Sequence, residues 1–212
     1  MNLFRNISTG EELIDKLQKN NYYLERPFID KSCSVVISSE YRQDLDLYTL
    51  SANSHPFPFL NDYFFNYYQF GQINQPAYIP RRLLTDGTTA ITPLMNGCAL
   101  EVRYDLRNDT YLFYHDNNGR QLSNPSIYEK VVCRITANNY YNDYWINDYM
   151  NQAAEKKVYF CIQFICVYYS GNWYVGTTGI VLGCNNKPVG IFPPKNGKYK
   201  RYFNRDEELI LQ

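Results

Sequence analysis

The 212-residue sequence predicts one α+β domain, with a twisted, largely antiparallel β core and peripheral helices. Beyond residue 86, short segments of alternating hydrophobicity are separated by Gly- and Asn-containing turns, a pattern typical of strands. Nearer the N-terminus, one amphipathic helix is followed by a stretch of weak pattern. We therefore expect a single domain over 1–212, in which 1–86 is helix- and loop-rich and 87–212 is the strand-rich core.

The N-terminal helix is predicted over 8–20 (STGEELIDKLQKN). Thr9 can cap this helix and Glu12 occupies the capping-box position. Its apolar stripe consists of Leu13, Ile14 and Leu17. From residue 22 to 86, only SVVIS at 34–38 indicates a strand, and the segments HPFPF and NQPAYIP indicate loops interrupted by proline.

After the turn signal Asp86-Gly87, six strands are expected, at 98–105, 110–115, 127–136, 158–169, 173–182 and 188–192. A Tyr-rich segment at 140–156 has a helical pattern, whose aromatic residues either pack on the sheet or form a surface that contacts protein or sugar. The basic segment 195–203 (KNGKYKRYF) is interpreted as a solvated face, with docking of an acidic partner or RNA as the alternative.

Composition excludes several classes of function. The 21 basic and 21 acidic side chains cancel, so neither nucleic acid nor an anionic membrane is the expected partner. The most apolar run, 158–169, is about half as long as the ~20 residues of a spanning helix, and Gln163 interrupts it. The N-terminus lacks the apolar segment of a Sec-type signal peptide.

The cysteines show neither metal-ligand spacing nor a CxxC pair. The six lie at positions 33, 98, 133, 161, 166 and 184. We interpret them as reduced thiols, most of them small core residues, and expect neither a metal ion nor a cofactor.

Residues 98–115 predict a hairpin that can bring a thiol and an imidazole together. With a two-residue loop, Cys98 lies directly opposite His115; with the four-residue loop LRND, His115 faces Leu100 and is diagonal to Cys98. Any even loop keeps Cys98 and His115 on one face, whereas an odd loop separates them. This is the arrangement that a nucleophilic thiol needs, because a neighbouring imidazole favours the reactive thiolate.

A structural interpretation of this pair is the alternative: Cys98 is one more core thiol, and His115 is a hydrogen-bonded residue at a strand end. Two observations favour catalysis. Gly97 lets the backbone approach a substrate, so amides beside it can stabilise an oxyanion. The only other histidine, His55, lies in a loop flanked by proline.

The segment Thr92-Pro93-Leu94-Met95-Asn96-Gly97-Cys98, followed by a strand, a turn and a strand ending at His115, resembles the bacterial toxin glutamine deamidases. That family includes the cytotoxic necrotizing factors and Burkholderia lethal factor, and it carries a Leu-Ser-Gly-Cys motif with a His on the next strand. The resemblance covers about 25 residues, and Met95-Asn96 stands where the family has Leu-Ser. It implies a mixed, largely antiparallel β-sandwich surrounded by helices and long loops.

The resemblance also implies an activity, the conversion of a glutamine of a host protein to glutamate by a single catalytic domain. Cys98 would be the nucleophile, His115 the general base and acid, and Thr92 an orienting member, with backbone amides near Asn96 and Gly97 holding the oxyanion. The implied targets are the translation initiation helicase or a Rho-type GTPase.

From the resemblance we expect a monomeric virulence toxin that blocks translation. We expect it to be secreted, or delivered into the host cytoplasm, without a Sec signal. Two alternatives stay open. One is another Cys-His enzyme, a transglutaminase or a peptidase, which also passes through an acyl-cysteine. The other is a non-enzymatic Tyr-rich domain that binds protein or carbohydrate.

Overall fold

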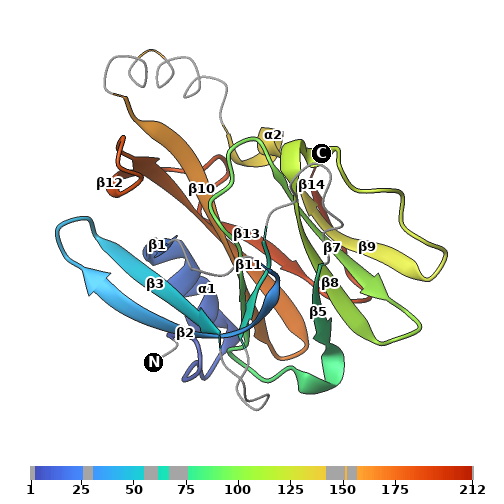
Figure 1. Cartoon of the computed structure of the whole chain (residues 1–212). Coiled ribbons are helices and arrows are strands. Elements are labelled where there is room, and N and C mark those ends of the chain that lie inside the picture. The colour runs from blue at the N-terminus through green and yellow to red at the C-terminus, as the bar shows by residue number, and fades with distance from the viewer. Residues whose placement is uncertain are drawn as a thin grey trace.

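A computed structural model describes residues 3–25, 31–54, 62–66, 76–141, 151 and 157–211. Two mixed β-sheets dominate it, and their inner faces pack around a common core (Figure 1). The larger is called sheet A and the smaller sheet B. No helix within these residues is long and apolar enough to cross a membrane.

Sheet A has nine described strands in the order β1-β3-β2-β4-β6-β10-β11-β12, with β13 also paired to β11. Its strands are β1 (Tyr22–Leu24), β2 (Cys33–Arg42), β3 (Leu47–Ser54), β4 (Asp62–Phe64), β6 (Thr89–Ile91), β10 (Tyr159–Tyr169), β11 (Asn172–Leu182), β12 (Pro188–Phe192) and β13 (Tyr199–Phe203). The pairs β1/β3 and β4/β6 are parallel, and the others are antiparallel.

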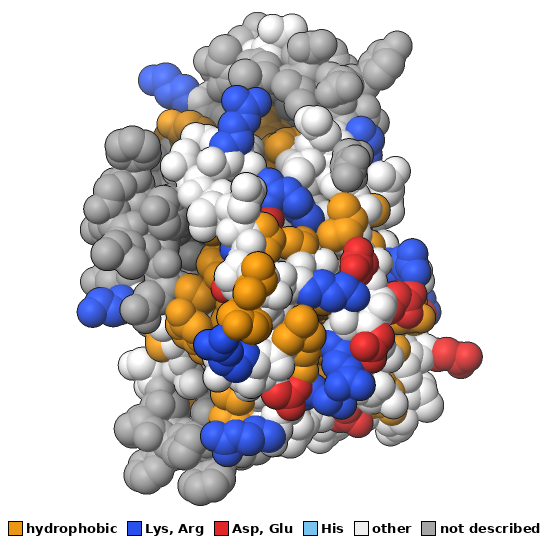
Figure 2. Space-filling view, turned by 90° about the vertical axis from the view of Figure 1, so that its right-hand side faces the viewer, with side chains coloured by type: hydrophobic (Ala, Val, Ile, Leu, Met, Phe, Trp, Pro, Cys, Tyr) orange, Lys and Arg blue, Asp and Glu red, His pale blue; other side chains and the backbone are white. Residues whose placement is uncertain are grey.

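Sheet B has five described strands in the order β14-β9-β7-β8-β5. They are β5 (Ala77–Pro80), β7 (Ala99–Asp105), β8 (Thr110–Asp116), β9 (Glu129–Ile135) and β14 (Leu209–Leu211), with only the β14/β9 pair parallel. The outer side of this sheet faces the viewer in Figure 2, where acidic, basic and hydrophobic side chains are interspersed.

Aromatic rings fill the core between the two sheets. Trp173 of sheet A is fully buried, and its ring centroid lies 4.9 Å from that of Phe113 of sheet B, in an edge-on arrangement. Phe203 of β13 also packs on Phe113. Large buried rings of this kind supply much of the apolar area that a fold removes from water, so they fix the position of β8 and of the residues at its end.

The prediction of an α+β fold surrounded by helices is wrong, because the chain is mostly β. The α-helices with described bounds are α1 (Gly10–Lys19) and the single turn α2 (Ala137–Tyr140), beside two 3₁₀ turns, η1 (Arg81–Leu83) and η2 (Asn117–Gly119). Most of the helix predicted at 140–156 lies outside the described residues. Where the structure describes its start, Tyr141 is already extended and ends α2.

The described part of residues 22–86 contains five strands in place of the expected single strand and loops. In β2, the run Ser38-Ser39-Glu40 does not alternate apolar and polar residues. It belongs to the sheet because it pairs antiparallel with β3. Pairing partners and half-buried positions decide such strands more than local propensity does. The segment NQPAYIP, predicted as a loop, likewise contributes β5 to the edge of sheet B.

The N-terminal helix and the six strands expected after residue 86 are confirmed, with ends that move by two residues at most. Thr9 caps α1 through its side chain, which accepts the Glu12 amide at 3.1 Å, and Leu13 and Leu17 are buried. The interpretation of 195–203 as a solvated face is wrong for its second half. There β13 pairs with β11, and Phe203 is fully buried.

Candidate active site

The β7–β8 hairpin has the four-residue loop LRND. Asp105 pairs with Thr110, and Leu100 pairs with His115, so the second of the two predicted registers is the observed one. Cys98 immediately precedes β7, and both Cys98 and Leu100 belong to the core between the sheets. Side chains two residues apart in a strand share a face, and Phe113 of that core is two residues before His115. The imidazole is therefore on the inner face, 3% exposed.

Thr92 follows β6 of sheet A and reaches across to sheet B. Its Oγ1 lies 2.7 Å from Nδ1 of His115, in a fully buried hydrogen bond. When Nδ1–H donates to Thr92, Nε2 becomes the proton-accepting nitrogen of the ring. Thr92 thereby fixes the orientation of the imidazole and favours the tautomer that a general base requires.

Gln163 of β10 holds the backbone of Thr92 in place. Its Nε2 donates to the Thr92 carbonyl at 2.7 Å, and its Oε1 accepts the Leu24 amide at 2.9 Å. This explains the polar residue that interrupts the most apolar run of the sequence. Gln163 is buried and bridges β10, β1 and the residue that orients His115.

The Cys98 thiol is 8% exposed and lies among polar groups of two loops. It donates to Oδ1 of Asn117 at 3.6 Å, directly after β8. Burial raises the pKa of the thiol above its usual value, and the Asp116 carboxylate acts in the same direction. The backbone of Asn118 and of Asn96 acts in the opposite direction and lowers that pKa.

Burial also lowers the pKa of His115, to about 3. With the thiol pKa raised and the imidazole pKa lowered, the resting pair is a neutral thiol and a neutral imidazole. A thiolate–imidazolium ion pair is not the ground state of this site. A thiolate at Cys98 would then form only by transfer of the thiol proton to a base, which is the chemistry of general-base catalysis.

Two tyrosines from α2 hold the loop before Cys98. The Tyr140 hydroxyl donates to the Cys98 carbonyl at 2.5 Å, and the Tyr141 hydroxyl lies 3.0 Å from the Phe160 carbonyl and 3.3 Å from that of Met95. Met95 itself exchanges two backbone hydrogen bonds with Ile162 of β10. The thiol is consequently carried by a loop that is fastened to sheet A and to α2.

Gly97 adopts a left-handed backbone conformation with φ +83°, which favours glycine. Among the described residues, a Cβ added there would meet no atom within 4 Å, although Cys98 next to it is almost fully buried. Neighbouring Asn96 is exposed and Asn117 is half-buried.

The sequence singled out Thr92, Cys98 and His115, and the structure joins Thr92 to His115 and puts Cys98 on the same face as His115. The sequence did not indicate the residues that hold these three. Gln163 had a signal, a polar residue within an apolar strand. Tyr140 and Tyr141 stood in a segment interpreted as helical packing. Asn117 had none, because its contact with Cys98 depends on the path of the chain after β8. His55, the other histidine, lies outside the described residues.

Four cysteines besides Cys98 and the exposed Cys184 are buried or half-buried as free thiols. Within the described part of the chain, no group of three or more His, Cys, Asp or Glu side chains is arranged to hold a metal ion. Comparison of the chain with protein-family models, with curated proteins and with solved structures finds no match.

Proposed function

We propose that the protein is a cysteine-dependent protein-glutamine deamidase of the toxin type. The observation that carries this proposal is the 2.7 Å hydrogen bond between Thr92 and Nδ1 of His115, in a hairpin register that keeps His115 on the same face as Cys98. Thr92 is the residue that the resemblance assigned to orient the histidine. A buried histidine of the core also needs a hydrogen-bond partner, so it is the identity of that partner, six positions before the cysteine, that supports the proposal.

In the proposed reaction, His115 takes the proton of the Cys98 thiol as the sulfur attacks the carboxamide carbon of a glutamine side chain. Backbone amides of the loop around Asn96 and Gly97 stabilise the negative oxygen of the tetrahedral intermediate. His115 then gives its proton to the departing nitrogen. Ammonia leaves, and a thioester joins Cys98 to the substrate.

Water completes the cycle. His115 removes a proton from a water molecule, which attacks the thioester carbon, and the proton returns to the sulfur as the C–S bond breaks. The net reaction turns glutamine and water into glutamate and ammonia. This chemistry calls for neither a metal ion nor a cofactor.

The test is to incubate the purified protein with eukaryotic lysate and to search for Gln-to-Glu conversions by mass spectrometry. Cys98→Ser is the inactive control. Cys166→Ser is the matched control, because Cys166 is another buried cysteine of this chain outside the proposed pair, and burial alone shifts its pKa. Conversions made by the native protein and by Cys166→Ser, and lost in Cys98→Ser, support the proposal.

Other outcomes separate the alternatives. Cys98-dependent crosslinks between lysate proteins identify a transglutaminase, and Cys98-dependent cleavage identifies a peptidase. Conversions that persist in Cys98→Ser refute the mechanism. If nothing is converted, crosslinked or cleaved, the non-enzymatic Tyr-rich binding domain becomes the better interpretation.

The same experiment identifies the substrate. The resemblance favours a host protein, either the translation initiation helicase or a Rho-type GTPase, and hence action in the host cytoplasm after secretion or delivery. Conversion of the helicase predicts inhibition of translation in the treated lysate, whereas conversion of a GTPase leaves translation unchanged. The identity of the modified peptide decides between them.

A further inference from the structure

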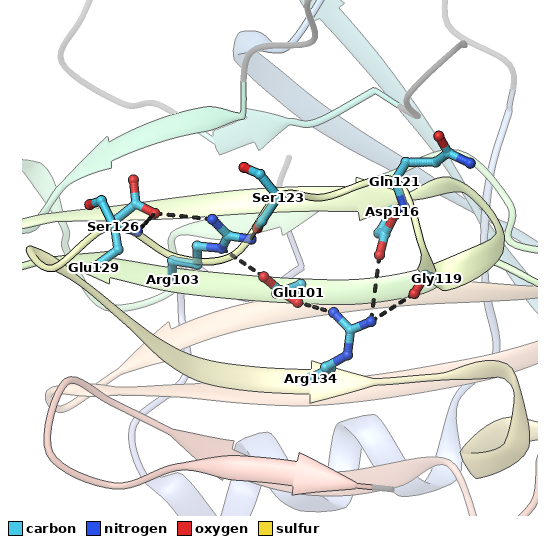
Figure 3. Close-up of polar contacts among 9 residues, drawn as sticks. All are labelled: Glu101, Arg103, Asp116, Gly119, Gln121, Ser123, Ser126, Glu129 and Arg134. Atoms are coloured by element: carbon cyan, nitrogen blue, oxygen red, sulfur yellow. Dashed lines mark hydrogen bonds and ion pairs between the residues drawn. The ribbon is translucent and has the colours of Figure 1, made fainter.

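A cluster of charged side chains lies on the outer face of sheet B, beneath the loop that joins β8 to β9 (Figure 3). Glu101 and Arg103 of β7 point outward yet are only 3% and 4% exposed. Glu101 lies between two guanidinium groups, those of Arg103 and of Arg134 of β9. Buried ion pairs seldom stabilise a fold more than well-packed apolar residues would. The role of this cluster is therefore better explained by the groups that its directional hydrogen bonds hold in place.

Arg134 ties this cluster to the turn η2. One of its nitrogens contacts Glu101, and the other donates to the carbonyl of Gly119 at 2.8 Å and lies 3.6 Å from Oδ2 of Asp116. Asp116 in turn accepts the Gln121 amide at 2.8 Å. The guanidinium group of Arg134 therefore contacts both ends of the turn 117–119, through the Gly119 carbonyl and the Asp116 carboxylate.

The same turn supplies the polar groups that surround the thiol. Asn117 accepts the hydrogen bond of Cys98, and the backbone of Asn118 lowers the pKa of the thiol. Asn118 and Gly119 both have positive φ, +55° and +64°. A non-glycine residue in this conformation needs surrounding contacts to hold it, and the Gly119 carbonyl is where Arg134 provides one.

From these contacts we infer that Arg134 is a positioning residue for the nucleophile: it fixes the turn 117–119 so that the Asn117 side chain meets the Cys98 thiol. Its meaning for catalysis rests on the proposed deamidase function. Its effect on the thiol does not, since it can be measured on the resting protein.

Arg103 offers a matched control within the same cluster. It donates to Glu101 at 2.6 Å, to the Ser123 carbonyl at 2.6 Å and to Glu129 at 3.0 Å. It is an arginine that also holds a carbonyl of the β8–β9 loop, but four residues beyond Gly119 and away from the thiol. A general loss of stability would affect both arginines, whereas positioning of the thiol depends on Arg134 alone.

The charged and titratable groups near the thiol come from three elements. Asp116 and His115 are on β8, Tyr140 and Tyr141 are at α2, and Cys161 is on β10. Like charge between Cys98 and the carboxylate, phenol and thiol groups among them raises the pKa values of these acids. Loss of the positive charge of Arg134 would itself raise the pKa of the thiol through Asp116. The test therefore uses Arg134→Lys, which keeps the charge and loses the fork.

The experiment measures the rate of alkylation of Cys98 by iodoacetamide between pH 6 and pH 11, with peptide mass spectrometry to resolve each cysteine. For Arg134→Lys we expect the midpoint of the Cys98 profile to fall by about half to one pH unit, because the neutral thiol loses the Asn117 acceptor that favours it, which speeds alkylation roughly three- to tenfold below the midpoint. Arg103→Lys should leave the midpoint unchanged. Thermal unfolding of both variants checks that they are folded.

An unchanged midpoint in Arg134→Lys, or an equal shift in Arg103→Lys, would overturn the inference. If Arg134→Lys does not fold, Gly119→Pro serves instead, since it leaves the Arg134 charge in place and distorts the turn that carries Asn117 and Asn118. The outcome is independent of the deamidase assay. If the midpoint shifts but no glutamine is converted, Arg134 is still a positioning residue and the proposed reaction is refuted. If glutamine is converted but the midpoint does not shift, only the role of Arg134 is refuted.

Discussion

The hydroxyl of Thr92 and Nδ1 of His115, 2.7 Å apart, join the two β-sheets at the site. Thr92 follows β6 in the middle of sheet A, and His115 is near the end of β8 in sheet B. A side-chain hydrogen bond between sheets is sensitive to any change in their packing. The orientation of the candidate base is thus coupled to the core that the sheets share.

Thr92→Val removes this hydrogen bond with little change in volume. A buried nitrogen that loses its partner costs about 1–3 kcal/mol, and a ring free to turn presents the wrong tautomer to the thiol. If this free energy is lost from the transition state, we expect kcat/KM for deamidation to fall roughly ten- to a hundredfold. Steady-state assays on the substrate peptide found in lysate provide the measurement.

Thr92→Ser and Thr89→Val are the controls for this prediction. Serine keeps the hydroxyl and should retain most of the activity. Thr89 is a buried threonine of β6 whose hydroxyl donates to the Gly87 carbonyl at 3.1 Å, so its valine variant loses a hydrogen bond without touching His115. Equal losses of activity in Thr92→Val and Thr89→Val would mean that Thr92 acts only through stability.

The burial of His115 should make the folded protein sensitive to acid. Burial lowers the pKa of the ring from 6.5 to about 3, so below pH 6.5 the unfolded chain binds a proton that the folded chain excludes. The contribution of the neutral ring to stability is complete above pH 6.5 and is lost as the pH falls towards 3. Between pH 7.5 and 4.5 we expect His115 to account for a loss of roughly 2–3 kcal/mol.

His115→Gln isolates this effect, because glutamine is polar at the same position and does not titrate. Urea unfolding at pH 7.5 and pH 4.5 gives the free energy of unfolding of both proteins. The native protein should lose more stability on acidification than the variant does. An equal loss in the two proteins would show that His115 is not held neutral by burial.

The sequence alone was sufficient for the hairpin and for the shared face of Cys98 and His115. Alternation of Leu100 and Val102, and of Tyr111 and Phe113, limited the pairing to even registers, and every even register places Cys98 and His115 on one face. The choice between a two-residue and a four-residue loop was open, since it depends on the conformation of Asp109, which has a φ of +49°.

The fold class could not be predicted because the evidence for it is non-local. The pairing of β2 with β3, and the parallel pairing of β4 with β6, join segments whose own sequences indicate strands weakly. The contacts of Arg134 with Gly119 and of Asn117 with Cys98 are non-local in the same sense. They follow from where the β8–β9 loop lies on the sheet, which no local pattern encodes.

Gly97 and Gly171 form a matched pair for testing the mouth of the site. Their φ values are +83° and +85°, and a Cβ at either would meet no atom within 4 Å. Substitution by alanine should therefore lower the free energy of unfolding by a similar amount at both positions, about 1–2 kcal/mol, because alanine is strained in the left-handed conformation. Only Gly97→Ala places a methyl group beside Cys98, so only that variant should lower kcat/KM, by tenfold or more through hindered approach of the substrate.

Urea unfolding and deamidation assays on the two glycine variants check this prediction. Gly171 lies in the β10–β11 turn, next to Ser170, and serves as the measure of backbone strain without an effect on the thiol. Similar loss of activity in both variants would indicate that strain spreads through the fold. Full activity of Gly97→Ala would mean that the substrate reaches Cys98 from another side.

Gln163 is the residue whose replacement should affect stability and catalysis together. Gln163→Leu leaves the Leu24 amide and the Thr92 carbonyl without their described partner in a buried environment, and each such group costs about 1–3 kcal/mol. We expect the free energy of unfolding to fall by roughly 2–4 kcal/mol.

Gln163→Glu separates the two roles. The carboxyl group keeps an oxygen to accept the Leu24 amide but loses the NH₂ group that donates to Thr92, so its defect is concentrated on the side of the site. Near neutral pH, a larger effect on kcat than on the binding of substrate would indicate that His115 has lost its orientation. If Gln163→Glu lowered stability but left kcat at the native value, the position of Thr92 would not depend on this glutamine, and the hydrogen bond to His115 would have to be maintained by the packing of β6 alone.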